Sequence, residues 1–383
     1  MKPDEGKRLK QNERLCIEMK DVQKFVRRGI LEIEPYVPGK PIEEVQEELG
    51  LLEIIKLASN ENPLGPSPRV LAAMEKELKY TNLYPEGSCA KLRRKISQRL
   101  GIDEDMITIS NGADNCIHLI TTSFINEGDE VLMADPTFAV YKTATKLMGG
   151  RPNFVGLRDH VHDLKAMQEK ISPQTKLIFV CNPNNPTGSI VRKNELDTFI
   201  NHLSENIILI IDEAYYEFVT DEGYPDSLDY IREGYNVISL RSFSKLYGIA
   251  GLRVGYALGC KELIDVINRV REPFPVSRVA QAGAFAVLED DEFKEQVLTI
   301  NEAGKAYFYD EFKKMGLQYV PSNTNFIFVD LGVDTKEVFE SLLREGIIIR
   351  PGHLWDCSTF ARITIGTMEQ NRRCIDALRK VLG

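Results

Sequence analysis

The segment over residues 237–256, VISLRSFSKLYGIAGLRVGY, constrains the chain most, because it sets a lysine among hydroxyl and guanidinium groups within one turn. A short apolar strand opens it, and the polar side chains that follow are Ser242, Ser244, Lys245 and Arg253. Such a group suits a phosphate-bearing aldehyde, since the lysine can form a Schiff base while hydroxyls and a guanidinium hold the phosphate. The alternative is a basic strand-to-loop junction whose lysine is merely solvated. This stretch alone does not decide between the two.

Length, charge and cysteine usage limit the class of protein. A chain of 383 residues is long enough for two domains, and its formal net charge of −9 argues against nucleic acid as the main partner. The seven cysteines form no CxxC pair, and the five histidines lack metal-ligand spacing. We therefore expect reduced thiols in a cytoplasmic protein, and neither a disulfide framework nor a metal site.

No segment of the sequence predicts insertion into a membrane. Residues 1–24 are charged and contain no apolar region of the kind found in a signal peptide. No apolar run approaches the length needed to span a bilayer, so we expect no membrane association.

Apolar segments between residues 106 and 256 alternate with helical or loop segments. This alternation predicts an α/β fold with a mostly parallel sheet, whose ligands bind at the carboxyl ends of the strands. No GxGxxG motif follows a strand, which disfavours a dinucleotide-binding fold. The expected strands are 106–110, 131–134, 176–180, 207–211 and 237–240.

Polar side chains follow two of these strands directly. Asp212 comes after the continuous apolar strand 207–211, where a carboxylate needs a partner such as a protonated pyridine nitrogen. Tyr215, three residues later, can reach a hydroxyl on the same ring. Asn185 lies in the loop after strand 176–180 and can offer an amide NH2 group to a phenolate oxygen.

Two further strand ends carry weaker signals. The turn NGAD at 111–114 separates a strand from an apolar helix, which is a geometry in which helix N-terminal amides can hold an anion. Any strand-helix connection can contain such a glycine turn. Phe138, just past strand 131–134, can stack on a cofactor ring or can simply pack in the core beneath the loop.

Taken together, these groups specify pyridoxal phosphate. Lys245 would hold the aldehyde as an imine and later move a proton, and Asp212 would keep the ring nitrogen protonated. Asn185 and Tyr215 would hold the ring oxygen. The cofactor supplies the electron sink, and the protein adjusts its electronic properties.

From about residue 30 onward the chain resembles the fold-type I aminotransferases, and within them the branch that acts on histidinol phosphate. The joint order of the motifs carries the resemblance. They are PYVPGK at 35–40, ASNENPLGP at 58–66, YP at 84–85, NGAD at 111–114, NPNNPTG at 182–188, DEAY at 212–215, SFSK with GLRVG at 242–255, and RITIGT at 362–367.

The resemblance implies a role for each matching residue. Lys245 would be the Schiff-base lysine, and Phe138 would stack on the ring. Tyr84 would reach the phosphate bound by the neighbouring subunit, and Tyr36 would lie in an arm that closes over the substrate. The residues implied around the cofactor phosphate are Ala113, Asp114, Ser242, Ser244 and Arg253. Those implied at the substrate are Tyr36, Asn60, Tyr84, Asn185, Arg350 and Arg362.

The same resemblance implies the fold and the assembly. It implies a large domain with a mostly parallel seven-stranded sheet, a smaller α+β C-terminal domain, and a homodimer with shared active sites. A proline-rich linker at 271–277 and apolar strands at 325–330, 346–350 and 360–365 agree with a second domain. The predicted division is a charged extension over 1–30, an arm over 31–58 that packs on the small domain and the dimer partner, a large domain over 59–275 and a small domain over 276–383.

Three reactions are weighed for this site. The favoured one is amino transfer between L-histidinol phosphate and 2-oxoglutarate, in which Arg362 binds a phosphate and a carboxylate in turn. The second is the same chemistry on an aromatic amino acid. The third is decarboxylation of an O-phospho amino acid by a lyase of the same fold.

Two departures from the family pattern concern the substrate side. The stretch PGHLWDCST at 351–359 lacks the expected glycine-rich loop and carries the chain's one tryptophan, Trp355. Arg278 stands where a small polar residue is expected. Trp355 and His353 can favour an aromatic side chain of the substrate, or can simply pack.

Overall fold

The computed structural model describes residues 24–27, 29–35 and 39–383. The chain divides into two compact units, Met1–Val37 and Pro38–Gly383. Within the first unit, the described residues contain the short 3-10 helix η2, Ile30–Glu32. Tyr36, which is predicted to close over the substrate, lies outside the described residues.

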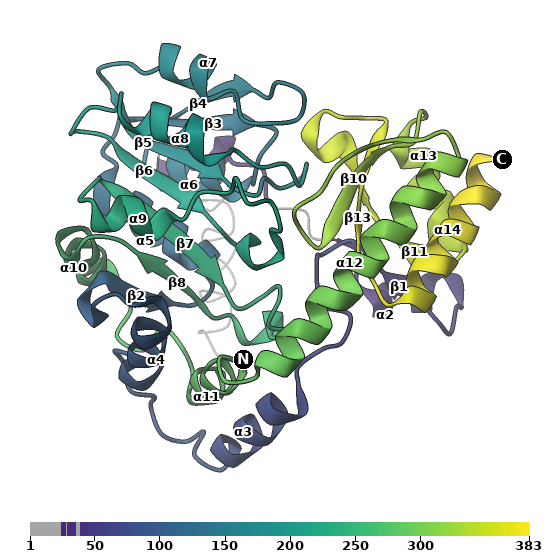
Figure 1. Cartoon of the computed structure of the whole chain (residues 1–383), viewed down its shortest axis with the longest axis horizontal. Helices are drawn as coiled ribbons and strands as arrows, with labels where there is room; N and C mark the ends of the chain where they lie inside the picture. The colour runs from purple at the N-terminus through teal and green to yellow at the C-terminus, as the bar shows by residue number, and fades with distance from the viewer. Residues whose placement is uncertain (1–23, 28, 36–38) are drawn as a thin grey trace, which may run out of the picture. The chain divides into compact units, whose positions relative to one another are not determined.

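The second unit contains a seven-stranded sheet, in which only β8 runs against its neighbours (Figure 1). This confirms the predicted α/β fold with a mainly parallel sheet. The strands, in order across the sheet, are β2 (Ile107–Ser110), β8 (Gly255–Leu258), β7 (Val237–Ser242), β6 (Ile208–Asp212), β5 (Thr175–Cys181), β3 (Glu130–Asp135) and β4 (Arg151–Gly156).

The continuous apolar strands lie in the middle of this sheet because they are buried on both faces. In β6, Leu209 and Ile211 join one hydrophobic cluster, whereas Ile208 and Ile210 join the other. Successive side chains of a strand point to opposite faces, so each face of the sheet has its own core. Strand β4 was not predicted, because it is an edge strand with a single buried side chain, Val155.

Helices cover both faces of the sheet and give three layers. One face packs against α5 (Ala113–Phe124), α6 (Val140–Leu147) and α10 (Lys261–Val270). The other packs against α4 (Ala90–Leu100), α7 (Leu164–Glu169), α8 (Lys193–Ile200), α9 (Ser227–Arg232) and α11 (Arg278–Val287). Helix α3 (Pro68–Leu78) lies against α11, and the short 3-10 helices are η3 (Glu104–Met106), η4 (Tyr216–Phe218) and η5 (Ala250–Leu252).

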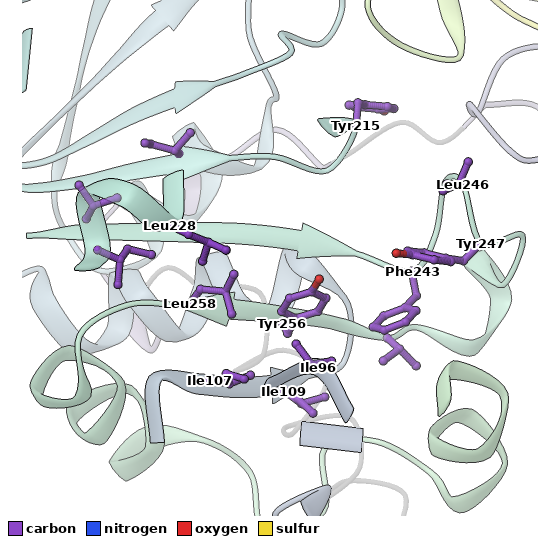
Figure 2. Packing of buried hydrophobic residues seen from close by; sticks show 14 of the residues in the cluster. Ile96, Ile107, Ile109, Tyr215, Leu228, Phe243, Leu246, Tyr247, Tyr256 and Leu258 are labelled. Carbon is purple, nitrogen blue, oxygen red and sulfur yellow. The ribbon is translucent and has the colours of Figure 1, made fainter. Parts of the chain in front are cut away.

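Figure 2 shows that the hydrophobic cluster containing Leu209 and Ile211 extends to the loop after β7, which carries Lys245. Phe243, Leu246 and Tyr247 are buried beyond the end of β7, close to Tyr256 of the neighbouring strand β8. Phe243 and Tyr256 are in ring contact, with centroids 5.7 Å apart. The residues that flank Lys245 are therefore anchored in the core, which fixes the backbone that carries the amine.

The C-terminal part contains an antiparallel sheet in the order β12 (Arg350–Pro351), β13 (Phe360–Thr364), β10 (Phe326–Asp330) and β9 (Gln318–Val320) (Figure 1). Its helices are α12 (Asp291–Lys314), α13 (Thr335–Arg344), α14 (Met368–Leu382) and the 3-10 helix η6 (Gly352–Trp355). Phe308 of α12 and Ile375 of α14 share a core with Ile363 of β13.

A second, two-stranded parallel sheet pairs β1 (Ile55–Lys56) with β11 (Ile347–Ile348), and α2 (Ile42–Leu49) lies before it in the chain. The strand predicted over 346–350 is thus two strands, since β11 pairs with β1 whereas β12 pairs with β13. The predicted boundaries at 58/59 and 275/276 remain predictions. Among the described residues, no helix has both the length and the apolar character needed to cross a bilayer.

Candidate active site

Lys245 lies three residues past the end of β7, and its amine is close to groups from other segments. Its Nζ lies 5.4 Å from the centroid of the Tyr215 ring and donates to the carbonyl oxygen of Ser59 at 3.4 Å. Burial, together with the positive charge of Arg362, lowers the pKa of Lys245 from its ordinary value of 10.5 to about 8. A useful fraction of the amine is therefore neutral, and hence nucleophilic, near physiological pH.

Asp212 is the last residue of β6 and is buried. Its Oδ2 accepts a hydrogen bond of 2.6 Å from the Tyr141 hydroxyl, and its Oδ1 accepts one of 3.1 Å from the backbone N–H of Ala214. Burial raises the pKa of Asp212 to about 6, although both hydrogen bonds oppose this rise. Asp212 is therefore anionic at neutral pH, and both of these donors are neutral groups.

Tyr141 was missed by sequence reasoning, although it lies only three residues after Phe138. Its ring stacks on Phe179 of β5, with centroids 4.4 Å apart, and meets the edge of Phe138 at 5.6 Å. The signal in the sequence was the shared position of Phe138 and Tyr141 beyond β3. Stacking of Phe138 on a cofactor ring stays a prediction.

Gly255 brings the expected phosphate ligands together. It pairs with Ser242 across β7 and β8, and a Cβ atom on Gly255 would lie 2.3 Å from the backbone nitrogen of Ala113. Ala113 begins α5, so the free N–H groups at the start of this twelve-residue helix lie beside the end of β7. Ser244 follows in the same turn, where its N–H donates to the Ser242 hydroxyl at 3.1 Å.

Arg253 completes this group. Its Nη2 donates to Oδ2 of Asp114 at 3.1 Å. A Cβ atom on Gly112, which caps α5 at a φ of 85°, would lie 2.6 Å from the same nitrogen. A helix N-terminus, two hydroxyls and a guanidinium form a site that suits a phosphate dianion.

Asn60 and Tyr215 meet beside Lys245. The Nδ2 group of Asn60 donates to the Tyr215 hydroxyl at 2.9 Å. Asn60 is fixed in turn by Thr364 of β13, whose hydroxyl donates to its Oδ1 and accepts from its backbone N–H, each at 3.0 Å. Burial raises the pKa of Tyr215, so its phenol stays protonated and can act as a donor.

Arg362 links the small sheet to the loop after β5. Its Nη1 donates to Oδ1 of Asn185 at 2.5 Å, and its Nη2 donates to the carbonyl oxygen of Ala58 at 2.6 Å. The Asn185 amide thus turns its oxygen toward the guanidinium and its NH2 group away from it. Arg350 lies opposite Arg362 in the pairing of β12 with β13, and both are buried. Two like charges at paired positions favour an anionic ligand between them.

Tyr84 and Arg278, which the sequence also singled out, contact residues other than those around Lys245. Tyr84 is 79% exposed and stacks on Phe274, with ring centroids 4.7 Å apart. Arg278 begins α11, where its Nε donates to Glu77 of α3 at 3.0 Å, and it lines a groove of about 800 Å³ between α3, α4 and α11. The approach of Tyr84 to a partner's phosphate stays a prediction.

The residues present fit pyridoxal phosphate. A buried carboxylate with two neutral donors suits a protonated ring nitrogen, and the phenol of Tyr215 suits a ring oxygen. The groups around Ala113 and Arg253 suit its phosphate, and the amine of Lys245 suits its aldehyde. Among the described residues, no cluster of three histidine, cysteine or acidic side chains is arranged to hold a metal ion.

Comparisons with known proteins agree with this chemistry. The family model "Aminotransferase class I and II" matches residues 53–378. A histidinol-phosphate aminotransferase of Moorella thermoacetica is 49% identical over 357 residues, which are 93% of this chain and 92% of that protein. Another, of Caldicellulosiruptor saccharolyticus, is 45% identical over 356 residues, covering 93% and 99% of the two chains.

A solved structure shows the same fold. Histidinol-phosphate aminotransferase from Sinorhizobium meliloti, determined in complex with pyridoxal-5'-phosphate, superposes with a TM-score of 0.86 at 26% identity, covering 93% of this chain and 97% of that one. The lysine, the carboxylate, the turn that suits a phosphate and these relatives lead to one conclusion: the chain belongs to the class I and II aminotransferase family, which has the fold-type I architecture.

Proposed function

We propose that this enzyme transfers an amino group between L-histidinol phosphate and 2-oxoglutarate in histidine biosynthesis, with pyridoxal 5'-phosphate as cofactor. The observation that carries the proposal is the position of Lys245 within the electrostatic reach of Arg362, the second largest cause of its lowered pKa. A reactive amine and an anion-binding guanidinium in one site suit a substrate whose phosphate or carboxylate lies a few bonds from the reacting amine.

Each residue has a defined task in this proposal. The cofactor supplies an electron sink that weakens the C–H bond at the amine-bearing carbon. Asp212 stays anionic and holds the ring nitrogen in its protonated form, and Tyr141 keeps the carboxylate in place. Lys245 accepts a proton on Nζ and returns it at a neighbouring carbon, for which a pKa of about 8 is well matched to neutral pH.

Arg362 binds the anionic end of either substrate. Its guanidinium presents N–H groups in a planar fork that matches a phosphate in one half of the reaction and a carboxylate in the other. Arg350, at the paired position of β12, adds a second positive charge. Asn60 and Tyr215 position the ring oxygen beside the lysine.

A scan of single half-reactions tests the proposal. The cofactor-loaded protein is mixed with histidinol phosphate, glutamate, phenylalanine, tyrosine or phosphothreonine, and its visible spectrum is recorded. Loss of the lysine-bound cofactor band with histidinol phosphate and with glutamate is the expected result. Release of carbon dioxide from phosphothreonine without this spectral change would identify a lyase instead.

Transamination of an aromatic amino acid is a second candidate, and one observation favours it. The indole of Trp355 lies 5.3 Å from the Arg362 guanidinium, so an aromatic surface borders the anion site. If phenylalanine and tyrosine convert the cofactor and histidinol phosphate does not, this second candidate replaces the first.

The active enzyme is further proposed to be a cytoplasmic homodimer that shares its active sites. The support is the exposed aromatic pair of Tyr84 and Phe274, which are 79% and 48% exposed. Mixing inactive Tyr84→Ala and Lys245→Ala proteins under conditions that exchange subunits should restore activity, because one site of each mixed dimer would be intact. A monomeric active species in sedimentation would contradict the dimer.

A further inference from the structure

The segment 351–359, where the sequence departs from the family pattern, forms a compact loop with a fixed shape. Its first turn is η6, and the N–H of Cys357 donates back to the carbonyl oxygen of Gly352 at 3.1 Å. A Cβ atom on Gly352 would lie 2.3 Å from the carbonyl oxygens of both Cys357 and Phe360, so only glycine allows the two ends of the loop to approach this closely. The Thr335 hydroxyl of α13 donates to the carbonyl oxygen of Ser358 at 2.8 Å and ties the loop to the helix.

This loop places Trp355 over the anion-binding arginine. The guanidinium carbon of Arg362 lies 5.3 Å from the centroid of the indole and 5.4 Å from that of Phe326. Arg362 is 7% exposed and Trp355 is partly buried, so the indole and the guanidinium meet largely out of contact with water. Contacts of this kind between a cation and an aromatic face are attractive, and they strengthen as water is excluded.

The indole is itself supported by the sheet that carries the arginine. Trp355 meets the edge of the Phe328 ring at 6.1 Å, and Phe328 stacks on Phe360 with centroids 4.7 Å apart. Phe328 of β10 lies directly opposite Arg362 of β13 in the register of the two strands. Both side chains therefore emerge on one face of the sheet, and Trp355 packs across that face.

We propose that Trp355 is a positioning residue for the anionic group of the substrate, acting through Arg362. Two of the arginine's N–H groups already bind Asn185 and Ala58. Stacking on an indole fixes the plane of the guanidinium without using an N–H donor, so it sets the direction in which those donors meet a phosphate or carboxylate. This inference rests on the proposed function for the role of Arg362, and it concerns affinity for the anion.

Substitution of Trp355 should separate binding from chemistry. In Trp355→Leu we expect KM for both L-histidinol phosphate and 2-oxoglutarate to rise about tenfold, because the variant loses a partly desolvated cation–π contact. Because the reacting atoms are untouched, kcat should stay within about twofold. Trp355→Phe keeps an aromatic face and should recover most of the loss. Leu354→Ala, at an exposed neighbouring position of the same loop, is the matched control and should leave both constants unchanged.

A fall in kcat at unchanged KM, or a Phe variant no better than the Leu variant, would overturn the proposal. The first result would give Trp355 a role in the chemical step, and the second would reduce it to filling space. A defect shared equally with Leu354→Ala would show that the integrity of the loop, rather than the indole, controls binding.

Fluorescence gives a readout that does not depend on turnover. Trp355 is the one tryptophan of the chain, so the emission of the cofactor-loaded protein reports on this position alone. Titration with inorganic phosphate or 2-oxoglutarate should change the emission to a plateau, and Arg362→Leu should abolish that response. An emission that stays constant at anion concentrations that inhibit the enzyme would refute the contact between indole and anion site.

The two experiments distinguish failure of the inference from failure of the proposed function. If histidinol phosphate is not a substrate, the fluorescence response to 2-oxoglutarate still tests the role of Trp355. If histidinol phosphate converts the cofactor normally but neither KM nor emission depends on Trp355, the proposed function stands and the inference fails.

Discussion

The hydroxyl of Tyr141 donates a hydrogen bond of 2.6 Å to the carboxylate of Asp212 in the buried centre of the site. Tyr141 belongs to α6 and Asp212 is the last residue of β6, so the bond joins a helix on one face of the sheet to the carboxyl end of a central strand. The bond lowers the pKa of Asp212, against the effect of burial. Tyr141 therefore favours the anionic form, which is the form that the proposed contact with a protonated ring nitrogen needs.

Tyr141→Phe should weaken cofactor binding. The variant leaves the aromatic stack intact but removes a donor to a buried carboxylate, which costs about 1.5–3 kcal/mol for a charged acceptor. We expect the dissociation constant of pyridoxal phosphate to rise at least tenfold, measured by equilibrium dialysis with detection of the visible band. Tyr235→Phe, which removes a hydrogen bond to Asn201 far from this site, is the control and should leave it unchanged. Equal affinities for the two variants would contradict this role of Tyr141.

Asp212→Asn should alter the pH dependence of stability in the cofactor-free protein. The pKa of Asp212 is raised from 3.8 to about 6, so the folded state binds this proton more tightly than the unfolded state. Its contribution to stability is fully present below pH 3.8 and is lost as the pH rises through 6. The melting temperature of the variant minus that of the wild type should therefore increase from pH 4 to pH 7. A difference in melting temperature that is independent of pH would contradict the raised pKa of Asp212. With cofactor bound, the variant should lose activity.

Capture of cofactor by the empty protein should follow the ionisation of Lys245. Only the neutral amine attacks the aldehyde, and its pKa is about 8, so the capture rate should rise as pH increases through 8. Stopped-flow absorbance at several pH values measures this midpoint. A midpoint near 10.5, the ordinary value, would refute the lowered pKa. Lys245→Ala should show neither capture nor turnover, whereas Lys193→Ala, an exposed lysine on α8, should behave as the wild type.

Gly112→Ala should damage the phosphate site as well as stability. The residue has a φ of 85°, and a Cβ atom there would lie 2.6 Å from Nη2 of Arg253. Gly101→Ala is a matched control, because Gly101 also has a positive φ, 63°, but has no atom within 4 Å of its Cβ position. Gly101→Ala should lose about 1 kcal/mol of unfolding free energy from left-handed backbone strain. Gly112→Ala should lose about 1–3 kcal/mol, because its ψ of 166° places it in a region that is almost exclusive to glycine. Only Gly112→Ala should weaken cofactor binding, and equal affinities would show that Arg253 moves aside without cost.

Arg362→Lys should show whether the planar fork matters beyond its charge. Lysine keeps the positive charge but loses the two-pronged geometry, so KM for both anionic substrates should rise roughly 10- to 100-fold, as for loss of a charge-assisted hydrogen bond. Steady-state kinetics with each substrate varied in turn measures this effect. Arg373→Lys, whose exposed partner is Glu53, is the control. A rise in KM for one substrate alone would show that the two anions do not share Arg362.

Local sequence patterns predicted the parts of this protein that depend on nearby residues. The apolar run before Asp212 predicted a buried central strand, because a strand covered on both faces has no polar position to interrupt it. The order of motifs predicted the family. The groups before and after Lys245 are neighbours along the chain, so the sequence showed an amine beside candidate phosphate ligands, and the other motifs favoured a cofactor site there.

Contacts between distant segments could not be predicted in this way. Tyr141 and Asp212 are 71 residues apart, and Arg362 and Asn185 are 177 apart, so their hydrogen bonds exist only once helices and strands have packed. Strand β4 lies at a sheet edge and has no continuous apolar run, and the segment 346–350 divides between two sheets according to the partners it meets.

The sequence by itself determined the α/β fold, the family and the residue types of the site, because hydrophobic periodicity and motif order are properties of the chain. The tertiary structure decided which groups touch and how they ionise. Burial sets the pKa values of Lys245 and Asp212, and strand register sets Arg362 opposite Phe328, beneath Trp355. These properties depend on distance and on the exclusion of water, and both are fixed only when the chain has folded.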